Sequence, residues 1–209
     1  MRLNWILIFL IAAVSAAQAQ RRSDIFKKDV PITWLGLDLT KTKLIGDRER
    51  YGSESDMRRL AEAWNDIFTK EPEKFNVARA VDRTEVKNAI EITKDHNQQL
   101  DIMSEYTDDK NQFTHMKLSD VDEIVADYDF SGLEGIGLMF VVESFSKLNG
   151  KAAVWVTFIN LQTKDVLLTE QLMGDPGGAG LRNYWANACY SILEKMKKKD
   201  FERWRKAFG

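Results

Sequence analysis

Three apolar runs in the second half of the chain constrain the fold more than any other feature. They are rich in β-branched and aromatic residues and span residues 136–145, 152–159 and 166–173. Asn149-Gly150 separates the first two runs, and this pair favours the type I′ turn of a hairpin because both residues tolerate a positive φ. Residues 162–165 form the second, less decisive turn. The sequence therefore predicts an antiparallel three-stranded meander.

Both faces of this meander need cover. Residues 138–142 read Leu-Met-Phe-Val-Val, although neighbouring residues of a strand point to opposite faces of the sheet. A sheet with one face in water cannot bury both sets of side chains. We therefore expect helices on one face and further cover on the other.

Upstream of the meander, the hydrophobic period changes between that of a strand and that of a helix. Residues 32–39 are a short apolar segment with β-branched and aromatic members, which predicts a strand buried on both faces. From Ser53, apolar residues recur every three or four positions until Pro72 ends the pattern, as in an amphipathic helix. Residues 75–81 alternate weakly, and we expect a second strand there.

Two more helices are expected before the meander. Asp82 is a candidate N-cap, and Glu85 three residues later completes a capping box for a helix that extends to about residue 100. Ser119 starts a shorter helix, with Asp122 in the corresponding capping position. Residues 101–118 are polar, and no structure is assigned to them.

The C-terminal segment is the most regular helical pattern. Apolar residues keep three- and four-residue spacing over residues 181–196, and Trp204 and Phe208 continue the stripe. The expected fold class is thus α/β (α+β), a mixed sheet with a C-terminal antiparallel three-stranded meander, helices packed on it and a long C-terminal helix. Residues 20–209 are expected to form one globular domain, because no linker or repeat divides them.

The N-terminus predicts export. Arg2 precedes an apolar run over residues 3–14, and Ala17-Gln18-Ala19 matches the cleavage rule of a secretory signal peptide. The run is shorter than the roughly 20 residues of a membrane-spanning helix. We expect residues 1–19 to be removed and the mature protein to be periplasmic or secreted; the alternative is an uncleaved N-terminal anchor.

Composition excludes several classes of protein. The chain is 44% hydrophobic and carries 30 basic and 32 acidic residues, which is typical of a globular protein and not of a disordered one. The balanced charge argues against a general nucleic-acid binder. Cys189 is the single cysteine, so the export signal holds no lipid-anchor cysteine and no disulfide forms within the chain.

The order of predicted elements resembles a known periplasmic domain. Strand, helix, strand, helix, short helix, meander and long helix is similar to the α/β domain shared by the curli secretion protein CsgG and the N-terminal domain of TolB, over roughly residues 30–200. The segments that carry the likeness are residues 32–39, 75–77, 135–138 and 160–166. The last of these resembles the family's Asp-x-x-Thr-Gly-x-Val turn, with Asn160 for Asp and Lys164 for Gly.

This resemblance implies an envelope accessory or assembly module. The lipid-anchoring cysteine and the membrane-spanning strands of the secretion protein have no counterpart in this sequence. A role as a secretion pore therefore does not carry over. A likeness at the level of fold assigns no catalytic residue.

The glycine-rich loop at residues 174–180 is the candidate ligand site. It leads into the last predicted helix, where backbone N–H groups and the helix dipole attract anions. The candidate residues are Gly177, Gly178, Gly180, Arg182 and Asn183. The loop lacks the Lys-Ser/Thr pair of a P-loop and the spacing of a dinucleotide fingerprint. The alternative, which we favour, is a strand-to-helix connection that binds nothing.

Other candidate sites are weaker. Residues 127–132 resemble the first half of a calcium loop, but position twelve is Leu138 and not the required Glu. His96 and His115 lie in different predicted elements without ligands at metal-binding spacing. No serine lies in a nucleophile-elbow setting, and Cys189 falls on an apolar stripe. We expect no catalytic residue, no metal site and no cofactor.

The basic C-terminal tail has two interpretations. Residues 195–206 combine lysines and arginines with aromatic residues, a composition that suits contact with an anionic membrane surface. Lysines near the end of a helix also stabilise its dipole, and this second interpretation is favoured.

The sequence thus favours an exported, non-enzymatic envelope accessory or binding protein. The expected partner is an envelope protein or a small ligand, and not nucleic acid. The alternative is an anion- or nucleotide-type ligand binder, or an enzyme, that uses the glycine-rich loop.

Overall fold

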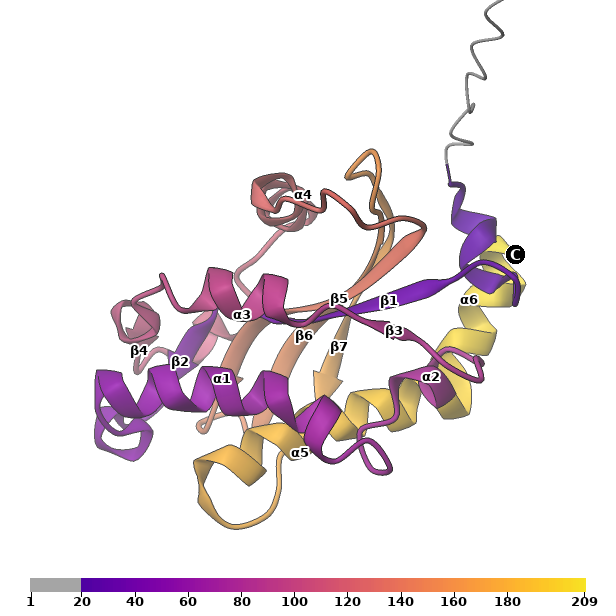
Figure 1. Cartoon of the computed structure of the whole chain (residues 1–209). Coiled ribbons are helices and arrows are strands. Elements are labelled where there is room, and N and C mark those ends of the chain that lie inside the picture. The colour runs from indigo at the N-terminus through magenta and orange to yellow at the C-terminus, as the bar shows by residue number, and fades with distance from the viewer. Residues whose placement is uncertain (1–19) are drawn as a thin grey trace, which may run out of the picture.

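The computed structural model describes residues 20–209, so the expected export signal lies outside the described residues. The strands are β1 (Ile32–Asp38), β2 (Lys43–Ile45), β3 (Lys87–Asn88), β4 (Tyr106–Thr107), β5 (Ile136–Ser146), β6 (Lys151–Asn160) and β7 (Val166–Gly174). The helices are α1 (Glu54–Lys70), α2 (Val77–Ala80), α3 (Glu91–Asn97), α4 (Leu118–Asp127), α5 (Gly180–Lys195) and α6 (Phe201–Phe208) (Figure 1). A π-helical turn, Met196–Asp200, joins α5 to α6.

The strands form one mixed sheet. β5, β6 and β7 pair antiparallel and form the meander that the sequence predicts. β1 and β2 both pair parallel with β5, with Asp38 opposite Val141 and Lys43 opposite Ser144. Because β6 occupies the other side of β5 along its length, β1 and β2 act as one interrupted strand. β3 and β4 pair parallel with the outer sides of β1 and β2.

Side chains replace the missing strand beside the second half of β1. β3 is only two residues long, so the β1 backbone beyond it has no ladder partner on that side. The buried residues Asn65 and Asn97 supply the bonds: Asn65 accepts from Leu37 N at 2.7 Å, and Asn97 accepts from Leu39 N at 3.0 Å. Thr93 donates to a further β1 carbonyl at 2.6 Å. Buried backbone groups need such partners, so α1 and α3 are fixed to β1 by polar side chains.

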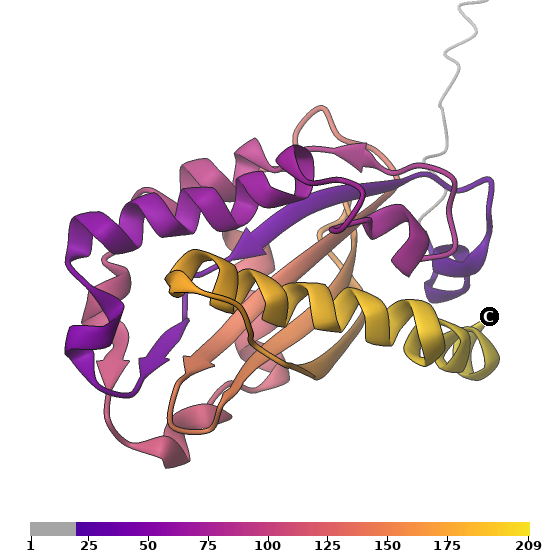
Figure 2. The same ribbon diagram turned by 90° about the horizontal axis from the view of Figure 1, so that it is seen from below.

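Both faces of the sheet are covered, as the apolar strands predicted, and the cover of the second face is also a helix. One face packs against α1, α5 and α6 through a core that contains Trp34, Trp64, Trp185 and Trp204. The other face packs against α4 through a smaller cluster with Met139 and Val141. Figure 1 shows α4 and α5 on opposite sides of the sheet, and Figure 2 shows α1 beside α5.

Several expected elements are confirmed. β1 lies within residues 32–39, and α1 follows Ser53, whose side chain accepts from Asp56 N while Asp56 accepts from Ser53 N. The long C-terminal helix forms, and α6 buries Trp204 as its continuation. Among residues 20–209, no helix is both long and apolar enough to cross a membrane.

Three local predictions are wrong. The strand expected at residues 75–81 is instead the helix α2, because the Asn76 side chain caps it by accepting from Arg79 N at 2.9 Å. Asp82 has φ of 51° and caps no helix; α3 starts only at Glu91. α4 starts at Leu118, so Ser119 is not its N-cap as expected; the Asp120 side chain instead accepts from the backbone N–H of Lys117 at 2.7 Å.

The turns and the unassigned segment also differ in detail. The first hairpin has a four-residue loop between Ser146 and Lys151, and only Gly150 has positive φ, so it is not a type I′ turn. In the second hairpin Lys164 has φ of 63°, a region that favours glycine. Residues 101–118, which had no assigned structure, contain β4 and two 3₁₀ helices, Ile102–Glu105 and Lys110–Phe113.

Candidate functional site

The glycine-rich loop folds back onto the first turns of α5. Gly177 donates its backbone N–H to the carbonyl of Tyr184 at 3.1 Å, and Asn187 donates to the Gly177 carbonyl at 2.7 Å. Gly178 and Gly180 have φ of 89° and 76°, which explains why glycine stands at both positions. The loop backbone is thus partly occupied by contacts with the helix.

The charged residue predicted for this site is also engaged within the protein. Arg182 contacts the carboxylate of Glu71 at 3.0 Å and donates to Asn183 Oδ1 at 2.9 Å. The structure brings the five predicted residues together at the start of α5. It gives their polar side chains partners that an anion would have to displace, and ligand binding by this loop stays a prediction.

A polar cluster that the sequence did not indicate lies where β1 ends. Asp38 is completely buried, and its carboxylate accepts from Tyr128 Oη at 2.6 Å and from Thr40 Oγ1 at 2.7 Å. Thr40 Oγ1 also lies 3.0 Å from His96 Nε2. Burial raises the pKa of the Asp38 carboxyl above its ordinary value, although the bonds from Tyr128 and Thr40 oppose the shift. A chain of hydrogen bonds therefore joins half-buried His96 to a buried acid.

The raised pKa of Asp38 predicts an unusual pH dependence of stability. A group with a pKa above its unfolded value contributes stability that is present at low pH and is lost as the pH rises through the folded pKa. The Asp38→Asn variant lacks this titration. We expect its free energy of unfolding, relative to wild type, to increase as the pH rises above 3.8. Urea denaturation of both proteins across this range checks it, and a difference that stays flat or decreases would contradict it.

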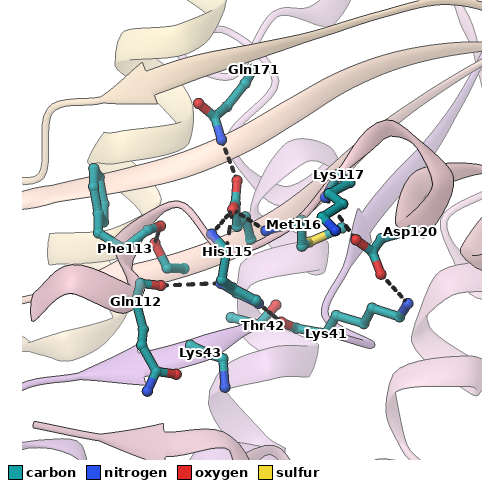
Figure 3. A network of polar contacts seen from close by, with 12 residues as sticks. Lys41, Thr42, Lys43, Gln112, Phe113, His115, Met116, Lys117, Asp120 and Gln171 are labelled. Atoms are coloured by element: carbon teal, nitrogen blue, oxygen red, sulfur yellow. Dashed lines mark hydrogen bonds and ion pairs between the residues drawn. The ribbon is translucent and has the colours of Figure 1, made fainter. Parts of the chain in front are cut away.

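A second polar cluster surrounds Glu143 of β5, on the same side of the sheet as α4. This carboxylate is completely buried and accepts from the backbone N–H of His115 and, at 2.6 Å, from that of Met116. It also accepts from Trp155 Nε1 at 2.9 Å and from the side-chain amide of Gln171. Figure 3 shows Gln171, His115 and Met116 converging on this one carboxylate. Four donors from four positions satisfy it.

The second histidine belongs to the same neighbourhood. His115 Nε2 lies 3.1 Å from the carbonyl oxygen of Lys41, and its Nδ1 lies 3.1 Å from that of Gln112 (Figure 3). The Lys41 ammonium in turn contacts Asp120 at 2.6 Å and Glu123 at 2.7 Å. Both histidines of the chain thus contact the segment that interrupts the strand between β1 and β2. These contacts fix residues 110–117 and α4 to the sheet.

An open cavity of about 330 Å³ lies on the other side of the sheet, between the end of α1, α2 and β3. We call it the Trp34 cavity. Trp34, Phe68 and Phe75 line it. The ring centroid of Phe68 lies 4.6 Å from that of Trp34 and 5.5 Å from that of Phe75. Trp34 is 1% exposed, and its Nε1 has no hydrogen-bond partner within residues 20–209. Trp34 lies in the segment 32–39 that the sequence predicts as a strand buried on both faces, and nothing in the sequence indicates a cavity, because its lining comes from separate segments.

The other residues considered in the sequence, namely possible metal ligands, the calcium-like segment and Cys189, do not form a binding site within residues 20–209. Within residues 20–209 no group of three or more His, Cys, Asp or Glu side chains is arranged to hold a metal ion. In the calcium-like segment, Asp129 accepts from the N–H and hydroxyl of Ser131, as in an ordinary polar turn. Cys189 is 1% exposed, and burial raises the pKa of its thiol to about 12, so at neutral pH it remains a thiol.

The basic tail is amphipathic, and its aromatic side faces inward. Phe201 and Trp204 are buried against the sheet, and Trp204 donates to Glu170 at 2.7 Å. Lys197 and Lys198 lie within 3.6 Å of the Glu194 carboxylate. The tail therefore offers mainly positive charge to an anionic surface, and Phe208, at 41% exposure, is its exposed aromatic residue. Membrane contact stays a prediction.

Comparison with known proteins gives little. No family model and no curated protein matches the chain. A solved structure of a Helicobacter pylori protein, described as a homolog of the neuraminyllactose-binding hemagglutinin, is similar at a TM-score of 0.32 and 11% identity, over 86% of this chain and 90% of that one. A TM-score this low carries no conclusion about fold or function.

Proposed function

We propose that the protein is exported to the cell envelope and acts there by binding a partner or a small ligand, without catalysis. The observation that carries the proposal is that the acidic groups of its two polar clusters are bonded within the protein. The carboxylates of Asp38 and Glu143, which a catalyst would aim at a substrate, are completely buried and bonded to side chains and backbone of the same chain. Such groups hold a fold together and are not positioned to exchange protons with a ligand.

Two features of the sequence support the location and the kind of role. Residues 2–19 have the charged start, apolar centre and small-residue end of an export signal. The order of elements predicted from the sequence resembles the α/β domain of CsgG and TolB, although residues 77–80 form the helix α2 where that order has a strand. Lys164 adopts a positive φ at the position where the family's turn has glycine. An envelope binding module is the role that this resemblance implies.

Cell fractionation tests the export step. We expect the full chain to be recovered outside the cytoplasm with Gln20 as its first residue, as read by mass spectrometry of the intact protein. A chain without residues 2–19 is the matched control and is expected to stay inside the cell. Recovery of uncleaved protein in the cytoplasmic fraction would overturn the proposed location.

Capture from envelope extract tests the binding step. The purified protein, immobilised through its C-terminus, is expected to retain one envelope component that the same protein, immobilised after heat denaturation, does not retain. Capture that is equal for both baits would reflect nonspecific adsorption and would count against a folded binding surface.

A further inference from the structure

We propose that the mature chain begins with pyroglutamate, formed by cyclisation of Gln20 after the export signal is removed. The inference rests on the proposed cleavage after Ala19, which makes Gln20 the N-terminal residue. It assigns a covalent modification to the new N-terminus of the protein. The substrate of the reaction is the chain itself, and no cofactor takes part.

Ring closure uses two groups of the same residue. Once the bond to residue 19 is cut, the α-amine of Gln20 attacks the side-chain carbonyl carbon, Cδ. A bond forms between N and Cδ, the bond between Cδ and Nε2 breaks, and Nε2 leaves as ammonia with a proton taken from the amine. The new ring is five-membered, and reacting groups held this close together react far faster than separate molecules do. No oxidant, metal or second reactant is required.

The surroundings of the new α-amine favour its reactive form. An α-amine has an ordinary pKa of about 8, so part of it is uncharged and nucleophilic at neutral pH. Arg21 and Arg22 follow Gln20 directly, and Asp24, the nearest acidic residue in the sequence, is paired with Lys27 at 2.7 Å. Two adjacent cations disfavour a third positive charge beside them. They therefore favour the uncharged amine that attacks the amide.

The Gln20 side chain is poorly held by the fold. It is half-buried, and its oxygen Oε1 is buried without a hydrogen-bond partner within residues 20–209. An unpaired buried acceptor is costly, so this carbonyl gains no hydrogen-bond energy from its position. Rotation of the side chain toward the α-amine therefore breaks no hydrogen bond of that oxygen.

The residues that follow Gln20 attach the N-terminal segment to the domain. The backbone N–H of Arg21 donates to Asp24 at 2.7 Å, and Arg22 Nε donates to the Leu167 carbonyl at 2.6 Å. The Arg22 guanidinium lies 4.8 Å from the ring centroid of Phe208 in α6, and Figure 1 shows this segment beside α6. None of these contacts uses an atom of residue 20. Ring closure therefore leaves them in place.

Cyclisation changes what the N-terminus presents to the envelope. The positive charge beside Arg21 and Arg22 disappears, and the lactam has no free α-amine. Aminopeptidases recognise that amine, so they are not expected to shorten the closed end. The contacts that Arg21 and Arg22 make with the domain are thereby protected from stepwise degradation.

Timed release of the N-terminus tests the reaction. The chain from Gln20 to Gly209 is made as a fusion, and a protease that cuts directly before Gln20 removes the carrier. Intact-mass spectrometry then follows the protein at neutral pH. We expect complete conversion to a species lighter by one molecule of ammonia, with an unchanged circular dichroism spectrum. A constant mass in a protein that remains folded would overturn the inference.

Gln20→Asn is the matched control. Asparagine carries the same amide on a side chain one methylene shorter, so its closure would need a strained four-membered ring. We expect this variant to lose no ammonia and to remain a substrate for aminopeptidase, whereas the wild-type chain becomes resistant once its ring has closed. Equal loss of ammonia from both proteins would place the reaction at another amide and overturn the assignment to Gln20.

Peptide mapping of the exported protein separates this inference from the proposed export. We expect the N-terminal peptide from the envelope fraction to start with pyroglutamate at position 20. An N-terminal Gln20 that keeps its free amine would overturn the inference and leave the proposed export intact. A chain that still carries residues 1–19 would overturn the proposed cleavage and, with it, the modification in the cell.

Discussion

The Glu143→Ala variant is expected to lose about 4 kcal/mol of unfolding free energy, within the range for breaking a buried, hydrogen-bonded charge site. The carboxylate is completely buried and accepts from two backbone N–H groups, an indole and a side-chain amide. Alanine leaves all four donors without a partner in the protein interior, and it opens a void beside them. Urea denaturation followed by circular dichroism measures the loss.

The Glu143→Gln variant separates hydrogen bonding from packing. Its side chain has nearly the same volume, and its oxygen can still accept from the N–H groups of His115 and Met116. Its NH₂ group, however, faces the donors of Trp155 and Gln171. We expect a loss about half that of alanine. If glutamine and alanine lower the free energy of unfolding equally, the two bonds from the backbone N–H groups of His115 and Met116 contribute nothing to stability.

How far the fold follows from the sequence depends on how local its causes are. The strands of the meander are apolar on both faces, and α1 carries its own cap, so each could be predicted from neighbouring residues. β2 and β4 are three and two residues long and exist because they pair with strands far away in the chain. No local pattern marks them. At residues 75–81, one capping side chain, Asn76, outweighs a weak alternation.

The polar clusters and the cavity escaped prediction for the same reason. His96 and His115 looked isolated because the residues around them are distant in sequence. The same holds within the Asp38 cluster, where the bonded residues Asp38 and Tyr128 are separated by 90 residues. Trp34 fits an apolar strand and was rightly placed in the core, but its indole has no acceptor, and this depends on which rings surround it. The glycine-rich loop was visible in the sequence, yet its main contacts are with its own helix.

The Gly36→Ala variant is expected to be among the least stable single substitutions of this protein, with a loss of about 4 kcal/mol or more. Gly36 has φ of 101°, a conformation that alanine adopts only with strain. A Cβ at this position would also overlap the side-chain oxygens of Asn65 and Thr93. Those two side chains supply the hydrogen bonds that replace a strand beside β1, so they cannot move aside without leaving buried backbone groups unpaired.

Gly132→Ala is the matched control for this prediction. Gly132 has φ of 83°, and no atom lies within 4 Å of the position that its Cβ would occupy. Alanine there adds backbone strain alone, which costs about 1–2 kcal/mol. The excess loss of Gly36→Ala over Gly132→Ala therefore measures the close approach of α1 and α3 to β1. Equal losses in urea denaturation would mean that Asn65 and Thr93 yield easily, and that the polar attachment of these helices to the strand is weaker than its geometry implies.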